Sequence, residues 1–417
     1  MKRGAQGALI LTRTGSESFR AFVPRSLPPK PPISVDTEMQ DLVERANRAL
    51  GRLDGITMLI PDIWLFLYYY VRKEAVLSSQ IEGTQSTLSD LLLFESKEVP
   101  GVPLNDVQEV SNYVAAMNHG LKRIKEGFPL SVRLLREIHE KLLAKGRGSG
   151  KGPGAFRTTQ NWVGGSRPGN AEFVPPPASE VVAAMGALEL FLHDKPGRTP
   201  LLMKAALAHV QFESIHPFQD GNGRLGRLLI SLLMCSEGAL SEPLLYLSLY
   251  FKRNRRQYFD LLQDVRLEGE WERWLEFFLQ GVIETSEQAG ETARRILALF
   301  DDDRKKIEKL GSSGGSAFRV HHLLQKKVYA SISSAVVELK LTYPTVSRSM
   351  AELVKLGIVQ EVTGKRRGRI FAYGAYLRIL SEGTEPLRDY EQEADMAAGQ
   401  TVSEPQPASD ADRMTRS

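Results

Sequence analysis

Apolar residues recur at three- and four-residue steps along most of the chain, which predicts helices. The clearest face comprises Met39, Leu42, Val43, Ala46, Leu50 and Leu53, with the spacing that one buried helix side requires. Further helical patterns cover residues 63–77, 106–124, 130–144, 179–194, 199–213, 223–235, 252–266 and 270–300. Helices with short connections throughout predict an all-α core.

Four segments interrupt this pattern. Residues 1–34 contain a β-like stretch and then five prolines between Pro24 and Pro32, which predicts an N-terminal arm or strand pair laid over the main domain. Residues 145–178 combine glycines, prolines and aromatic residues, and predict a β-hairpin flap beside the core. The Gly/Ser-rich run 311–316 predicts a flexible linker over residues 301–317. Residues 381–417 are acidic and poor in apolar residues, and are expected to be disordered.

Composition narrows the class of protein. Of the 417 residues, 42% are hydrophobic and 25% are charged, as in ordinary globular proteins. The single cysteine, Cys235, excludes a disulfide framework and a Cys-based zinc site. No run approaches the roughly 20 apolar residues that span a bilayer, and the N-terminus lacks a signal-peptide core. A cytoplasmic protein without membrane contact is the expectation.

Charge is distributed unevenly near the C-terminus. Residues 318–380 contain eleven Lys or Arg against three Glu, a net charge of +8, whereas residues 381–417 have a net charge of −6. This asymmetry predicts a basic module followed by an acidic tail.

The densest candidate chemistry lies between the helices predicted at 199–213 and 223–235. Gly221, Asn222 and Gly223 would present backbone N–H groups at the start of the second helix, which makes an anion site suited to phosphate. Arg224 and Arg227 would emerge on one side of its first turn and clamp phosphate oxygens. Asp220 offers an oxygen ligand for Mg²⁺, and His216 can accept a proton from a hydroxyl near pH 7. Together these groups suit phosphoryl or nucleotidyl transfer.

The run His216–Arg227 resembles the signature of the Fic family, His-x-Phe-x-(Asp/Glu)-Gly-Asn-Gly-Arg-x-x-Arg, and matches every specified position. The resemblance implies a protein adenylyltransferase (AMPylator) that moves AMP from ATP to a Tyr, Thr or Ser hydroxyl of a target protein and of itself. His216 would be the base, Phe218 a buried anchor, and Asp220 the Mg²⁺ ligand. Gly221, Asn222, Gly223 and Arg224 would bind the phosphates, and Arg227 the γ-phosphate.

Two further segments resemble parts of the same family. Residues 156–158, 163–165 and 173–176 resemble the flap that pairs with a target's backbone, so Val163 and Gly164 are expected near the nucleotide. Tyr258 and Phe259 resemble the helix segment that encloses adenine. A homodimer is also typical of relatives.

The segment Ser78–Gly83 matches the family's inhibitory motif, (Ser/Thr)-x-x-x-Glu-(Gly/Asn). Ser78 and Glu82 share a helix face, and Gly83 is a natural C-cap. The resemblance implies that Glu82 pairs with Arg227 in place of the γ-phosphate. The alternative is that Glu82 positions a water for AMP removal, and the sequence does not decide between these directions.

Residues 318–380 resemble a winged helix-turn-helix. Thr342 and Pro344 begin its third predicted helix, whose exposed start carries Thr345, Ser347 and Arg348. Strand-like residues 358–363 and 370–373 flank a basic tip with Lys365, Arg366, Arg367 and Arg369. DNA is the expected partner, with the tip on phosphates; protein docking is the alternative.

The predicted organisation is therefore an arm (1–34), a helical region with the inhibitory motif (35–110), a Fic catalytic core (111–300), a linker (301–317), a winged helix (318–380) and a tail (381–417). A competing hypothesis is a DNA-binding regulator that senses nucleotide and turns over little. Another is a different donor, such as another nucleotide or phosphocholine. The sequence does not identify the target.

Overall fold

The computed structural model describes residues 3–14, 17–56, 63–96, 104–364 and 368–386. As expected from the periodicity, the fold is mostly helical with small antiparallel sheets. The N-terminal half contains α1 (Thr37–Ile56), α2 (Ile63–Ile81), α3 (Leu88–Ser96), α4 (Leu104–Lys125), α5 (Val132–Leu142) and α6 (Val181–Leu192). Then follow α7 (Leu201–Ile215), α8 (Asn222–Ser236), α9 (Ser248–Arg253), α10 (Arg255–Glu268) and α11 (Trp271–Glu308).

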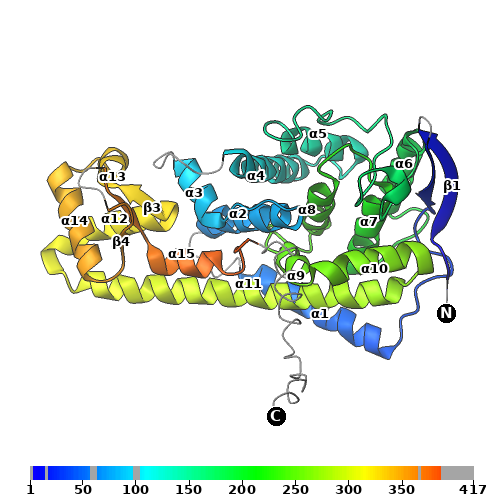
Figure 1. The fold of residues 1–417 in the computed structure, drawn as a ribbon. Coiled ribbons are helices and arrows are strands. Elements are labelled where there is room, and N and C mark those ends of the chain that lie inside the picture. The colour runs from blue at the N-terminus through cyan, green and yellow to red at the C-terminus, as the bar shows by residue number, and fades with distance from the viewer. Residues whose placement is uncertain (1–2, 15–16, 57–62, 97–103, 365–367, 387–417) are drawn as a thin grey trace, which may run out of the picture.

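Helices α7 and α8 form an antiparallel pair at the centre of the part of the molecule built from α1 to α11. They are surrounded by α2, α4, α5, α6, α9, α10 and α11 (Figure 1). Nearly every residue of both helices is buried, the polar ones included. Polar side chains buried in this way must find partners within the protein. The short loop between α7 and α8 is therefore fixed at both ends by buried, hydrogen-bonded helices.

The expected N-terminal strand pair forms as β1 (Gly7–Thr14) and β2 (Glu17–Pro24), an antiparallel hairpin. It lies at the end of the molecule beside α6, α7 and α10 (Figure 1). The backbone N–H of Phe22 donates to the carbonyl of Val174 at 2.8 Å, which ties β2 to residues 145–178.

The hairpin predicted for residues 145–178 is reduced to one bridge. Val163 and Phe173 exchange two backbone hydrogen bonds of 2.9 and 3.1 Å. Otherwise the segment forms turns and the 3₁₀ helices η1 (Pro168–Asn170) and η2 (Ala178–Glu180). Its backbone groups bond to the α7–α8 loop and β2, so a longer ladder is not formed.

The C-terminal module follows the 38-residue helix α11, which runs along most of the length of the molecule (Figure 1). The module contains η3 (Gly311–Ser313), α12 (Gly314–Lys327), β3 (Tyr329–Ser331), α13 (Ile332–Leu339), α14 (Tyr343–Lys355), β4 (Gln360–Glu361), β5 (Ile370–Ala372) and α15 (Gly374–Ser381). The strands form one antiparallel sheet in the order β3-β5-β4. The sequence did not indicate β3 or α15.

The prediction of a flexible linker at residues 301–317 is wrong. α11 continues to Glu308, and α12 begins at Gly314. Ile307 and Ala317 are fully buried, and Ser349 donates to the hydroxyl of Ser316 at 3.0 Å. Gly and Ser give a flexible chain only where nothing packs against them, and here neighbouring helices do.

The first residues of the predicted disordered tail are also ordered against the core. The side-chain amide of Gln80 donates to the carbonyl of Thr384 at 2.8 Å, and Lys252 donates to the carbonyl of Gly383 at 3.0 Å. Glu382 receives two hydrogen bonds from Arg295. Residues 387–417 lie outside the described residues.

Candidate functional site

The loop between α7 and α8 places the candidate chemistry in one turn of chain. α7 ends at Ile215 and is capped by His216, which has a left-handed backbone with φ of 48°, and Gly221 precedes α8 with φ of 76°. The side chain of Asn222 closes the loop, because its amide oxygen accepts from the N–H of Phe218 at 2.9 Å and its NH₂ donates to the carbonyl of Phe218 at 2.8 Å. Asn222 thus holds the loop shape.

Phe218 is fully buried, as expected for an anchor, and stacks on the ring of His139 from α5 at 3.8 Å between centroids. The N–H of Gly154 donates to Nδ1 of His139 at 2.9 Å, so the ring proton lies on Nε2, which donates to the carbonyl of Asp220 at 2.9 Å. Burial lowers the pKa of His139 to about 4. This neutral imidazole fixes the loop beside Asp220.

Arg157 holds the other end of the loop through backbone carbonyls. Its guanidinium donates to the carbonyls of His216 at 2.9 Å and Ile215 at 3.4 Å, and also to that of Pro176. Neither Arg157 nor His139 was identified as a site residue from the sequence. The only signals were a histidine on the apolar face of α5 and an arginine inside the predicted flap.

His216 is suited to accept a proton. Burial and the nearby cationic Arg266 and Arg157 lower its pKa to about 4, so its ring is neutral at pH 7. Nδ1 lies 3.9 Å from Oε2 of Glu213, and it makes no hydrogen bond within the described residues. Burial, together with the charge of Glu82, raises the pKa of Glu213 to about 7.

The two arginines of the loop signature are each paired with carboxylates. Arg227 Nη2 donates to Oε1 of Glu82 at 2.7 Å and to the carbonyl of Ser78 at 2.9 Å, while Nε donates to the Ser78 hydroxyl at 2.9 Å. Burial alone would raise the pKa of Glu82, but the charge and hydrogen bond of Arg227 hold it below its usual range. Gly83 has the left-handed backbone of a helix end, with φ of 93°. The pairing that the inhibitory motif implied is thus present.

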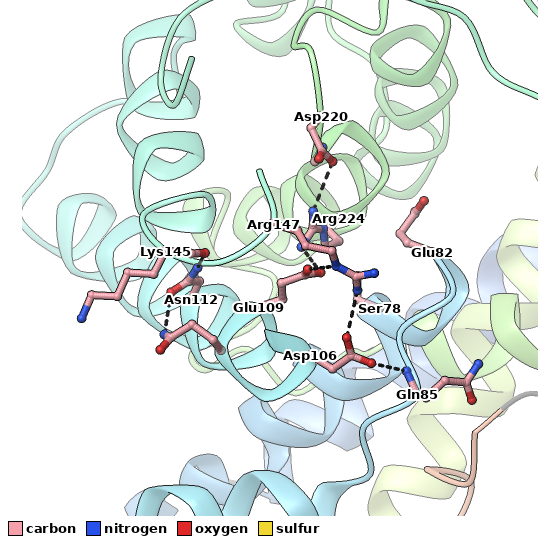
Figure 2. Close-up of polar contacts among 12 residues, drawn as sticks. Ser78, Glu82, Gln85, Asp106, Glu109, Asn112, Lys145, Arg147, Asp220 and Arg224 are labelled. Atoms are coloured by element: carbon pink, nitrogen blue, oxygen red, sulfur yellow. Dashed lines mark hydrogen bonds and ion pairs between the residues drawn. The ribbon is translucent and has the colours of Figure 1, made fainter. Parts of the chain in front are cut away.

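Arg224 pairs with carboxylates other than Glu82. Its Nη2 donates to Oδ1 of Asp220, and its Nη1 to Oε2 of Glu109 on α4, both at 3.3 Å (Figure 2). Within the described residues, no group of three His, Cys, Asp or Glu could hold a metal ion. Mg²⁺ bound with a nucleotide needs only one or two carboxylates, because phosphates and water supply the remaining ligands. The partly exposed Asp220 fits that requirement.

The residues expected to contact the nucleotide differ in how deeply they are buried. Val163 is half-buried in its bridge with Phe173, and Gly164 is exposed. The side chain of Tyr258 is 1% exposed, and its hydroxyl lies 2.8 Å from Nε2 of His209 inside the aromatic core. Phe259 remains half-buried, with the Arg255 guanidinium 5.0 Å from its ring centroid.

The DNA-contact candidates lie on the C-terminal module. Arg348 and Arg369 are exposed, whereas Thr345 and Ser347 are half-buried. Lys365, Arg366 and Arg367 lie outside the described residues. α14 begins after Thr342 with Pro344 in its first turn, as the sequence predicted.

The fold and site define a helical protein in which a short loop between two buried helices gathers a histidine, an aspartate and two arginines. Sequence comparison finds two matches: residues 129–234 match the Fic/DOC family, and residues 40–122 match the Fic/DOC family N-terminal domain. These two regions of the chain are therefore similar to that family. Among the helices that the structure describes, none is both long and apolar enough to cross a membrane.

Curated relatives include the protein adenylyltransferase Fic of Aedes aegypti, 29% identical over 259 residues. These are 58% of this chain and 49% of the relative. The protein of the same name in Drosophila grimshawi is 27% identical over 271 residues, 61% of this chain and 49% of the relative. The chain thus matches about half the length of these distant homologues.

A solved Fic family protein from Desulfovibrio desulfuricans G20 superimposes with a TM-score of 0.54 at 20% identity. The superposition covers 82% of this chain and 98% of the solved chain. This structural similarity shows that the two chains share a fold.

Proposed function

We propose that this chain is a protein adenylyltransferase that moves AMP from ATP to a hydroxyl of a protein, and that Glu82 restrains it. The observation that carries the proposal is the loop His216–Arg227, with a neutral histidine, a partly exposed aspartate, a helix N-terminus and two buried arginines. The distant homology to protein adenylyltransferases supports the same activity.

In the proposed reaction His216 takes the proton of the target hydroxyl, whose oxygen attacks the α-phosphorus of ATP. The bond from that phosphorus to the bridging β-phosphate oxygen breaks, and pyrophosphate leaves. The N–H groups at the start of α8 and the side chain of Arg224 stabilise the charge on the phosphates. Asp220 would hold the Mg²⁺ that accompanies ATP and neutralises phosphate charge. The flap around Val163 and Gly164, with Phe259, would border the nucleotide.

The proposed restraint follows from competition for one guanidinium. Arg227 is 3% exposed, and its hydrogen bonds with Ser78 and Glu82 occupy Nε and Nη2. A γ-phosphate that binds Arg227 has to displace Glu82, which costs an ion pair.

The test is transfer of label from ATP carrying it on the α-phosphate, with the protein itself as acceptor. We expect faint labelling of the wild type, strong labelling of Glu82→Gly and none of His216→Ala. Glu126→Gly is a matched control, because Glu126 also follows the last residue of a helix and pairs with an arginine, Arg123; it should behave as wild type.

Label placed on the γ-phosphate should not be incorporated by any variant. If Glu82→Gly stays unlabelled, the transferase proposal fails. Loss of AMP from a pre-labelled acceptor in the wild type and not in Glu82→Gly would support AMP removal instead. Incorporation from labelled phosphocholine or another nucleotide would reassign the donor.

A second candidate function concerns the C-terminal module. Three helices packed with a small antiparallel sheet, and the exposed Arg348 and Arg369, support the proposal of a winged helix that binds DNA. Fluorescence anisotropy with a labelled random-sequence duplex tests it. Affinity should fall steeply with added salt, and further in Arg348→Ala/Arg369→Ala, because counterions are released when arginines neutralise phosphates. A duplex that does not bind at low salt would favour protein docking.

A further inference from the structure

Glu109 lies at the centre of an ion-pair network that reaches Arg224. It extends from α4 and is 8% exposed. Oε2 accepts from Arg224 Nη1 at 3.3 Å, while Oε1 accepts from Arg147 Nε at 2.7 Å (Figure 2). One buried carboxylate thus joins an arginine of the phosphate-binding loop to an arginine of the segment after α5.

Arg224 is held in one orientation by this contact. It is 5% exposed, Nη1 faces Glu109, and Nη2 faces Asp220 at 3.3 Å. Its Nε makes no hydrogen bond within the described residues. Because Glu109 fixes one edge of the planar guanidinium, the opposite edge is directed at Asp220 and at the start of α8.

The network also ties Glu109 to two other segments. Arg147 Nη2 donates to Oδ1 of Asp106 at 2.9 Å, and the backbone N–H of Gln85 donates to Oδ2 of Asp106 at 3.0 Å. Asn112, one helical turn after Glu109, donates to the carbonyl of Lys145 at 2.7 Å. These bonds fix the chain on both sides of Glu109, so that its carboxylate has a defined place (Figure 2).

We infer that Glu109 is a positioning residue for the nucleotide, acting through Arg224. Asp220 would hold the cation that accompanies ATP, and Arg224 would then keep Glu109 as its carboxylate partner. Its Nη2 edge is then free to bind the β-phosphate of ATP or ADP. This inference rests on the proposed function only in assigning the phosphates to this loop.

The test is calorimetric binding of ADP and of AMP, with Mg²⁺, to Glu82→Gly and to Glu82→Gly/Glu109→Gln. Glutamine keeps the shape and loses the charge. We expect ADP affinity to fall about tenfold, as for loss of a charged hydrogen bond, with AMP affinity unchanged because AMP has no β-phosphate. Glu137→Gln is the control: Glu137 also bridges two arginines, Arg123 and Arg133, and ADP affinity should not change.

Equal losses for ADP and AMP, or no loss for either, would overturn the inference. Arg147→Gln provides a second variant should Glu109→Gln fail to fold. Arg147 is largely exposed, and its loss removes one of the two arginines that hold Glu109. A smaller selective loss of ADP affinity is expected, and unchanged ADP affinity contradicts the inference.

Self-labelling separates the two proposals. If Glu82→Gly labels itself while Glu109→Gln retains ADP affinity, only the Glu109 inference fails. If Glu82→Gly never labels itself while ADP affinity falls selectively, only the transferase proposal fails.

Discussion

Gly223 and Glu82 approach so closely that a β-carbon on residue 223 would lie 2.1 Å from Oε1 of Glu82. The glycine therefore makes room for the carboxylate that pairs with Arg227, in addition to presenting backbone N–H groups at the start of α8. Phosphate binding and the pairing of Glu82 with Arg227 thus depend on the same position.

This contact predicts that Gly223→Ala and Glu82→Gly are not additive. Gly223→Ala alone should lower the free energy of unfolding by about 1–3 kcal/mol, because the new methyl group displaces Glu82 from Arg227. In the Glu82→Gly background the same change should be neutral or stabilising, since alanine favours a helix over glycine by roughly 1 kcal/mol. Urea denaturation of the four proteins measures the coupling; additive effects would show that the two residues do not interact.

The hydroxyl of Ser78 should contribute to the restraint. Ser78→Ala leaves Nε of the buried Arg227 without its acceptor, which should cost about 1–3 kcal/mol of stability and weaken the hold on Glu82. Self-labelling should rise above the wild type and stay below Glu82→Gly. Ser79→Ala is the matched control, because the Ser79 hydroxyl is buried and has no hydrogen-bond partner within the described residues. Equal labelling of the two serine variants would contradict this role.

The stability of the protein should fall on acidification below about pH 6.5. Four histidines, of which all but His216 are buried, have pKa values lowered by loss of solvent to about 4 or about 3: His139, His209, His216 and His321. Each stays neutral in the folded chain while the unfolded chain binds a proton, so its contribution is complete above pH 6.5 and is lost as the pH falls toward 4.

Two glutamates have the opposite effect on the pH dependence of stability between about pH 4.5 and pH 7. Burial raises the pKa values of Glu74 and Glu213 to about 7, so their contribution is complete below their unfolded pKa and is lost as the pH rises through 7. The four histidines outnumber them, and the net change is a loss on acidification. Denaturation at pH 7 and pH 5 checks this. In His321→Gln the difference between the two values should shrink by about 1–2 kcal/mol, and an unchanged difference would contradict the assignment.

The docking of residues 382–386 should stabilise α2, the helix that carries Ser78 and directly precedes Glu82. A chain ending at Ser381 loses the carbonyl of Thr384 that Gln80 contacts and the carboxylate that pairs with Arg295. We expect its unfolding free energy to fall by about 1–3 kcal/mol, measured against a chain ending at Pro386 as control. Equal stability of the two truncated chains would show that these contacts contribute nothing.

The sequence by itself determined the helical fold and the chemistry of the α7–α8 loop. Gly221, Asn222 and Arg227 work through local geometry, namely a left-handed turn, a side-chain clamp between residues four apart and the first two turns of a helix. Groups this close along the chain take their positions from the backbone conformation that those residue types favour. The pattern also placed Glu82 and Ser78 on one helix face, and the family resemblance supplied their partner.

Only the tertiary structure decided the contacts between distant segments. Glu109 and Arg224 are 115 residues apart, and the bonds of His139 to Asp220 and of Arg157 to His216 likewise join separate elements. Nothing in the local pattern of α4 distinguishes Glu109 from a solvated glutamate. The same reason explains why α11 and α12 extend into residues 301–317 and why Tyr258 is buried. The composition of a segment predicts the conformation that it would adopt in isolation. Packing against neighbouring helices determines which polar groups lose their water and must form hydrogen bonds within the protein.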